Sequence, residues 1–157
     1  MATPYKVLFD GVITKLRSSG LPNITEDQLD EILLDYIRPA CIKFWACRQD
    51  LTQRDDSLGS FGFELNDKEI EILVGFMFIE FINANYINTP LLLRQSLASR
   101  DYHAFSARNH LDGLMNLTER VEKEVRQWIS VYSNIGSSLF GRLKKQQGGA
   151  SSVMGGL

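Results

Sequence analysis

The stretch from Ile70 to Ile82 has almost no polar side chain, and this most constrains how the chain can fold. Within it only Glu71 and Glu80 are charged. Asn66 lies three residues before Glu69, the spacing of a capping box, which predicts that a helix begins there. A helix that is apolar on nearly every side must be covered by other elements. We therefore expect an all-α fold, a helical bundle with this helix buried at its centre.

The two glutamates argue against other readings of this helix. A membrane span needs about 20 apolar residues and rarely carries acids, so we expect no membrane partner. Glu71 and Glu80 are separated by about 13 Å along a helix axis, which is too wide for the carboxylate pair of a glycosidase. We interpret each as a capped or ion-paired side chain at the margin of the helix.

The segments before this helix predict two helices and a connection. Apolar residues at helical spacing indicate a short amphipathic helix over residues 4–17. A second helix is expected after Thr25 as N-cap, with a kink or restart near Pro39, since proline removes a backbone donor. The polar, glycine-bearing segment Gln49 to Phe63 predicts a loop or a short hairpin.

Beyond the central helix, Thr89 and Pro90 predict the start of a short helix over residues 91–97. A long amphipathic helix is expected from about Ser106 to Tyr132, because apolar residues recur three and four apart. Its predicted packing face comprises Leu111, Leu114, Thr118, Val121, Val125, Trp128 and Tyr132, widened by Leu117 and Ile129. The width of this face favours packing within a bundle over an isolated coiled coil.

The composition changes after Asn134. We expect a helical-bundle domain over residues 1–135 and an extended, flexible tail over residues 136–157, rich in glycine and serine, that becomes ordered on a partner. The apolar and basic residues of this tail are its candidate partner-binding residues: Leu139, Phe140, Arg142, Leu143, Lys144 and Lys145. The three basic residues suit either phosphate or protein, and we favour protein contact.

Acidic residues concentrate on the second predicted helix, at Asp27, Asp30, Glu31 and Asp35. Such a cluster is usually a solvated face. In a ring-shaped assembly it is also suited to lining an anionic channel. The linear charge pattern does not choose between the two, so both alternatives stay open.

Composition and motifs exclude several function classes. The 157 residues carry 17 basic and 19 acidic side chains, a net charge of -2, which disfavours a dedicated nucleic-acid binder. We find no phosphate-binding glycine loop, nucleophile elbow or dinucleotide fingerprint, so we expect no enzyme and no cofactor. His103 and His110 lack the spacing of a metal site. Cys41 and Cys47 are best read as small buried residues rather than a disulfide.

Two segments resemble the neck proteins of tailed bacteriophages. The first is Leu65-Asn66-Asp67-Lys68-Glu69-Ile70-Glu71-Ile72-Leu73, followed by Met77-Phe78-Ile79-Glu80-Phe81. The second is Leu97-Ala98-Ser99-Arg100-Asp101-Tyr102, then Phe105-Ser106-Ala107-Arg108-Asn109-His110-Leu111, with a charged amphipathic helix ending at Tyr132-Ser133. The resemblance covers roughly residues 65–133. Phe81 stands where that pattern often carries tryptophan.

The resemblance implies a head-to-tail connector, or adaptor, located in the neck of the virion and made in the host cytoplasm. Such proteins form a ring, often a dodecamer, beneath the portal. The implied partners are other copies of the chain, the portal protein, an adjacent neck or tail protein, and DNA that passes without sequence-specific contact. The alternative is a small cytoplasmic helical regulator that acts as a dimer through the face of the long helix.

Overall fold

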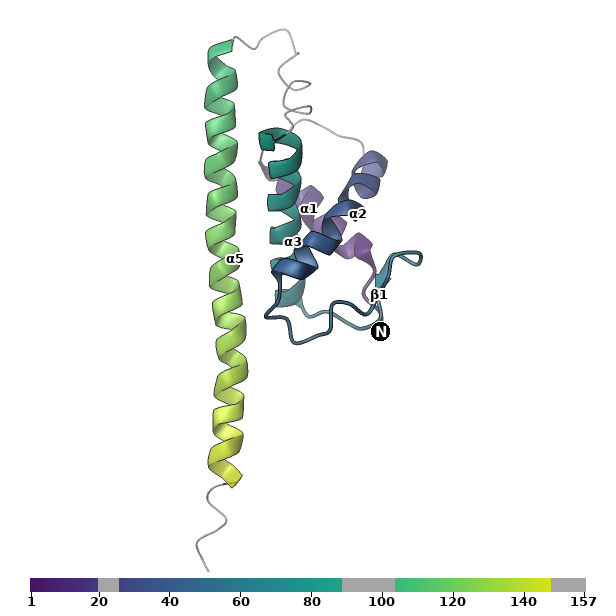
Figure 1. The fold of residues 1–157 in the computed structure, drawn as a ribbon, viewed down its shortest axis with the longest axis vertical. Helices are drawn as coiled ribbons and strands as arrows, with labels where there is room; N and C mark the ends of the chain where they lie inside the picture. Colours follow the sequence, from purple (N-terminus) through teal and green to yellow (C-terminus); the bar gives the residue numbers. More distant parts are fainter. Residues whose placement is uncertain (20–25, 89–103, 148–157) are drawn as a thin grey trace, which may run out of the picture.

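The computed structural model confirms an all-α fold with a very small sheet (Figure 1). It describes residues 1–19, 26–88 and 104–147, with side chains described over 1–19, 29–88 and 109–135. The order of elements is α1 (Tyr5–Ser18), α2 (Glu26–Lys43), β1 (Arg54–Asp55), β2 (Ser60–Phe61), α3 (Asp67–Ile82), the π-helix η1 (Asn83–Asn88) and α5 (Ala104–Gln147).

The α3 helix is the central helix, as the sequence predicts. It contacts α1, α2, η1 and α5, and most of its side chains are buried. Its start is a complete capping box: the Asn66 side chain accepts from the Lys68 and Glu69 amides, and the Glu69 carboxylate accepts from the Asn66 amide. This arrangement satisfies donors that a helix start leaves unpaired.

The segment Asp67–Asn88 passes a length and composition test for a membrane span, but 61% of its most apolar window is buried inside the protein. This burial is supplied by the neighbouring helices, which cover α3 in the way expected for a core helix.

The α2 helix runs without interruption through Pro39 to Lys43. The sequence leads us to expect a kink or a restart there, and no restart occurs. Leu33, Ile37 and Ala40 form its buried stripe, so packing against α3 stabilises the helix on both sides of the proline. The expected N-cap, Thr25, lies outside the described residues.

The predicted connection between α2 and α3 is a short hairpin. Arg54 pairs with Phe61 and Asp55 with Ser60, antiparallel. Gly59 closes the turn with a φ of 61°, in the left-handed region that glycine adopts readily. The N-terminal segment joins the hairpin: Thr3 donates to the Phe63 carbonyl at 3.0 Å and accepts from the Phe61 amide at 2.9 Å.

The α5 helix packs along α3 and then continues beyond the bundle (Figure 1). It ends at Gln147, which corrects the expected extended tail from residue 136: residues 136–147 are helical. Once a helix has formed, each added residue contributes a hydrogen bond, and this outweighs the low propensity of Gly136 and Gly141. Residues 148–157 and the short helix expected over 91–97 lie outside the described residues.

Candidate interaction surface

An open groove runs between the end of α2, the second half of α3 and the middle of α5. Its volume is about 580 Å³. Its apolar lining consists of Trp45, Phe76, Ile79 and Ile129. The residues that line the groove are Lys43, Trp45, Phe76, Ile79, Asn83, Glu122, Arg126 and Ile129.

The charged side chains beside this apolar lining are paired with one another. Lys43 of α2 pairs with Glu80 of α3, and Arg126 donates to Glu122 one turn earlier on α5 at 2.6 Å. The groove therefore carries balanced charge around an apolar strip, the usual composition of a surface that receives another protein segment.

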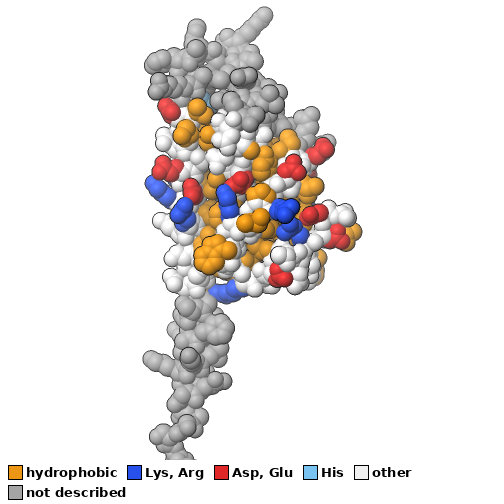
Figure 2. Space-filling model, viewed as in Figure 1, with side chains coloured by type: hydrophobic (Ala, Val, Ile, Leu, Met, Phe, Trp, Pro, Cys, Tyr) orange, Lys and Arg blue, Asp and Glu red, His pale blue; other side chains and the backbone are white. Residues whose placement is uncertain are grey.

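Large apolar side chains next to the groove are exposed. Trp45 is 83% exposed and Ile42 is 69% exposed, although the residue directly before each of them, Phe44 and Cys41, is buried. Figure 2 shows hydrophobic side chains gathered among charged ones on this face of the bundle. Tryptophan is among the residues that most often dominate binding at protein interfaces.

The last part of α5 adds a second exposed apolar strip. Trp128, Val131 and Ile135 are 46%, 48% and 38% exposed. The exposure of Trp128 corrects the prediction that it belongs to the packing face, because α5 turns Val125, Ile129 and Tyr132 toward the bundle instead. The other buried members of the predicted face, Leu114, Thr118 and Val121, lie where expected.

A buried polar network holds α5 beside the groove. The Tyr132 hydroxyl donates to Glu69 at 2.5 Å and accepts from the Arg48 amide at 2.9 Å. The Arg48 guanidinium donates to the Tyr132 carbonyl at 2.9 Å and lies over the Tyr132 ring. Burial and the hydrogen bond to Glu69 raise the pKa of the Tyr132 phenol above its usual range.

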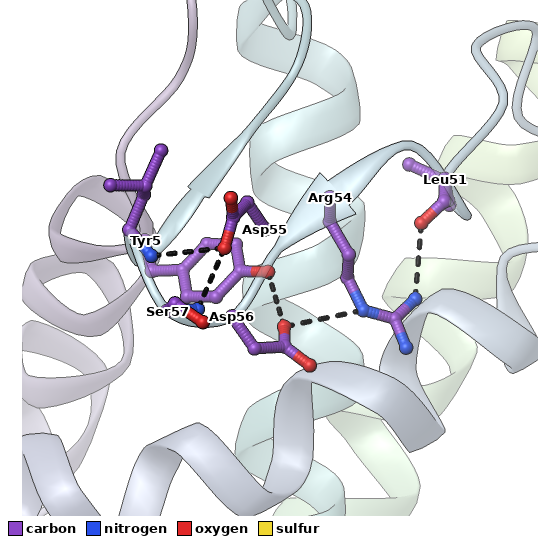
Figure 3. Close-up of polar contacts among 7 residues, drawn as sticks. Tyr5, Leu51, Arg54, Asp55, Asp56 and Ser57 are labelled. Atoms are coloured by element: carbon purple, nitrogen blue, oxygen red, sulfur yellow. Dashed lines mark hydrogen bonds and ion pairs between the residues drawn. The ribbon is translucent and has the colours of Figure 1, made fainter.

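A second polar cluster fixes the hairpin against α1 (Figure 3). The Tyr5 hydroxyl donates to Asp56 at 2.6 Å, and the Arg54 guanidinium lies 3.5 Å from the same carboxylate. Arg54 also donates to the Leu51 carbonyl at 3.1 Å. Burial and the contact with Asp56 raise the pKa of Tyr5 above its usual range. These contacts join the hairpin to α1 and stabilise the fold.

The predicted site residues divide between two locations. Among the acids of α2, Asp30 forms an ion pair with Lys6 at 2.9 Å, Glu31 and Asp35 are exposed, and the Asp27 side chain lies outside the described part. The candidate residues from Leu139 to Lys145 belong to the protruding end of α5, where the backbone alone is described. The structure therefore does not bring the two groups together within one chain (Figure 1).

The remaining chemical candidates have structural roles in the described part of the chain. Glu71 lies 3.5 Å from Lys15 and Glu80 pairs with Lys43, as expected of ion-paired acids. Both cysteines are free, and burial raises the pKa of the Cys41 thiol to about 11. A search of the described residues finds no group of three side chains able to hold a metal ion, and His103 lies outside them.

Sequence reasoning missed the groove and its exposed tryptophan. A signal was available: Ile42 and Trp45 fall off the buried stripe of α2, which runs through Leu33, Ile37, Ala40 and Phe44. Apolar residues off the core stripe of an amphipathic helix indicate a second contact surface.

Comparisons of this chain with protein-family models, with curated proteins and with solved structures found no match.

Proposed function

We propose that this protein is a structural subunit of the head-to-tail connector of a tailed bacteriophage, forming a ring beneath the portal through which DNA passes. Two features support the proposal. One is the resemblance of roughly residues 65–133 to neck proteins. The other is a fold with an open groove beside the exposed Trp45 and a helix that continues beyond the bundle, both suited to contacts with other chains.

The observation that carries the proposal is the length of α5. This helix extends past the bundle that it packs on (Figure 1), and its last described side chains include the exposed Trp128, Val131 and Ile135. A helix that protrudes beyond its own core gains contacts when another protein covers it. An assembly subunit has such a partner permanently.

The proposed role requires neither a cofactor nor catalysis. DNA crosses the ring without base-specific contacts, consistent with the net charge of -2. The acidic side chains on α2 include the exposed Glu31 and Asp35. The location that follows is the neck of the virion, with synthesis in the host cytoplasm.

The alternative, a cytoplasmic regulator that dimerises through the face of the long helix, would need that face to be available. Leu114, Thr118, Val121 and Val125 are instead buried within the chain, where α5 packs on α3. A dimer would have to use the exposed strip that ends at Ile135. This observation favours the connector over the regulator.

Native mass spectrometry of the full chain, alone and mixed with the portal protein of a candidate phage, tests the proposal. We expect a complex with the portal that contains several copies of the chain, visible as a ring by electron microscopy. A stable monomer or dimer that ignores the portal would contradict the connector and support the regulator. An unrelated ring-shaped protein of similar charge serves as the control for non-specific capture.

A further inference from the structure

We propose that the protruding end of α5, residues 136–147, binds the outer surface of α2 in a second copy of the chain and lies antiparallel to it. The outer surface of α2 is defined by six exposed residues: Glu31, Leu34, Asp35, Arg38, Ile42 and, just after the helix, Trp45. The inference deepens the proposed function, on which it rests for the biological setting, by naming the contact between subunits.

The first argument is that the protruding segment cannot reach α2 of its own chain. The α5 helix is continuous to Gln147 and leads away from the bundle (Figure 1). Its sequence nevertheless carries Leu139 and Leu143, one helical turn apart, next to Phe140. Apolar residues at this spacing form one side of a helix, which is stabilised by burial against another surface. We assign that surface to a second molecule.

The second argument is that α2 offers an uncovered apolar surface of matching kind. Ile42 and Trp45 are 69% and 83% exposed, and Leu34 is 41% exposed. Ile42 and Leu34 lie eight residues apart along α2, about 12 Å by the rise of a helix. A partner helix of a few turns covers such a surface in one contact.

The third argument is charge complementarity, which selects α2 as the receiving element. The sequence EDQLDEILLDYIRPACIK of α2 contains five acidic and two basic residues, a formal charge of -3. The segment 136–147 contains Arg142, Lys144, Lys145 and no acid, a formal charge of +3. Pairing two such segments with each other would place like charges together, whereas binding to α2 places opposite charges together.

The order of residues along the two helices sets the antiparallel direction. In α2, Glu31 and Asp35 precede the two most exposed apolar residues, Ile42 and the following Trp45: Asp35 comes about 10 Å before Ile42 along the axis. In the protruding segment the order is reversed, with Phe140 about 8 Å before Lys145. The antiparallel arrangement puts Phe140 beside Ile42 with Lys144 and Lys145 on the side of Asp35, whereas the parallel arrangement carries the two lysines away from it.

This contact joins two different surfaces, so each copy offers one and receives the other. Such heterologous contacts propagate from copy to copy and form a ring when the rotation closes. A symmetric dimer through this contact alone would require residues 136–147 of each copy to bind α2 of the other copy at the same time.

Charge reversal on either side tests the contact, with association followed by sedimentation velocity and native mass spectrometry. We expect the double variant Glu31→Lys with Asp35→Lys, and separately Lys144→Glu with Lys145→Glu, to weaken self-association by about tenfold or more. A chain carrying all four changes restores it, and an equimolar mixture of the two double variants assembles although neither does alone. Reversal of Glu119 and Glu124 on α5 is the matched control and leaves association unchanged.

The circular dichroism spectrum and thermal transition of each variant establish that it is folded, since all the changed residues of α2 are exposed. The inference is overturned if the wild-type chain does not self-associate, if the double variants associate as the wild type does, or if the fourfold variant is not restored. A chain that binds the portal without this contact overturns the inference and leaves the connector intact. Assembly that depends on these charges, in a chain that does not bind the portal, supports the inference and contradicts the connector.

Discussion

Tyr132 shows how one side chain can hold the end of a long helix. Its hydroxyl joins the buried Glu69 carboxylate to the Arg48 amide, and its ring packs edge-on against Phe44 with centroids 5.5 Å apart. The same Glu69 closes the capping box of α3. One buried carboxylate therefore couples the start of the central helix to the last part of α5 that lies on the bundle.

Replacing Tyr132 by phenylalanine tests this coupling. We expect the free energy of unfolding to fall by about 1 to 3 kcal/mol, because the buried Glu69 loses a hydrogen bond that water cannot replace. Urea denaturation measures the change. Tyr36→Phe is the matched control: its hydroxyl accepts from Asn85 at a half-buried site, so its loss is smaller. Equal losses in the two variants would contradict the coupling.

Cys41 gives the fold a sensitivity to alkaline pH. The pKa of its thiol is about 11 in the folded protein because of burial, against an ordinary value of 9.0. Between these values the unfolded thiol ionises while the folded one stays protonated, so stability is complete below about pH 9 and falls as the pH rises toward 11. Burial also raises the pKa of Tyr86, to about 12, in the same direction.

We therefore expect the free energy of unfolding to fall by about 1 to 3 kcal/mol from Cys41 between about pH 9 and pH 11. Thermal unfolding over this range measures the loss. Cys41→Ala is the control, since it has no thiol to ionise and should lose less stability over the same interval. An identical pH profile for this variant would show that Cys41 is not responsible.

At the scale of elements, the contact between α3 and α5 depends on a glycine. A Cβ at Gly75 would overlap the Val125 side chain, so the two helices approach more closely there than an alanine permits. Gly113, earlier on α5, has open space around it. The two glycines predict opposite effects of the same substitution.

Gly75→Ala should destabilise the protein by about 1 to 3 kcal/mol through overpacking. Gly113→Ala should stabilise it by up to about 1 kcal/mol, because alanine favours the helix. Adding Val125→Ala to Gly75→Ala should recover part of the loss, since it removes the overlapping methyl groups. Chemical denaturation of Gly75→Ala, Gly113→Ala, Val125→Ala and the double variant checks this, and a purely additive double variant would argue against a close contact at this position.

At the scale of the molecule, the bundle and the protruding helix have separable roles. Among the side chains that the structure describes, the core extends from Tyr5 to Tyr132. The α5 backbone continues to Gln147, where the sequence supplies apolar and basic residues. In our proposal, the residues up to Ile135 are sufficient for folding, and residues 136–147 are needed for assembly.

A chain that ends at Ile135 should therefore stay folded and soluble but fail to assemble. We expect its urea midpoint to match that of the full chain, while sedimentation velocity shows a loss of the larger species. A chain that ends at Gln147 is the matched control and should assemble as the full chain does. If the shorter chain still assembles, the assignment of residues 136–147 to the subunit contact is wrong.

Local sequence signals predicted where the helices and strands lie better than they predicted which residues are covered by the rest of the protein. The capping box, the apolar run of α3 and the hairpin all depend on neighbours in the sequence, and the structure confirms them. The sequence also indicated that Glu71 and Glu80 are ion-paired, but their partners, Lys15 and Lys43, lie on other helices. The exposure of Trp128 was missed, because a spacing of three or four residues does not decide which side of a wide apolar face meets the bundle.

By itself, then, the sequence determined that a helix without a polar face must lie at the centre of a helical bundle, since only burial can accommodate it. The tertiary structure decided where that bundle ends relative to α5, which left Trp45 and Ile42 exposed and brought Tyr132, Glu69 and Arg48 together. These features arise from contacts between residues far apart in the chain. Local periodicity reports the face of a helix but not what covers it.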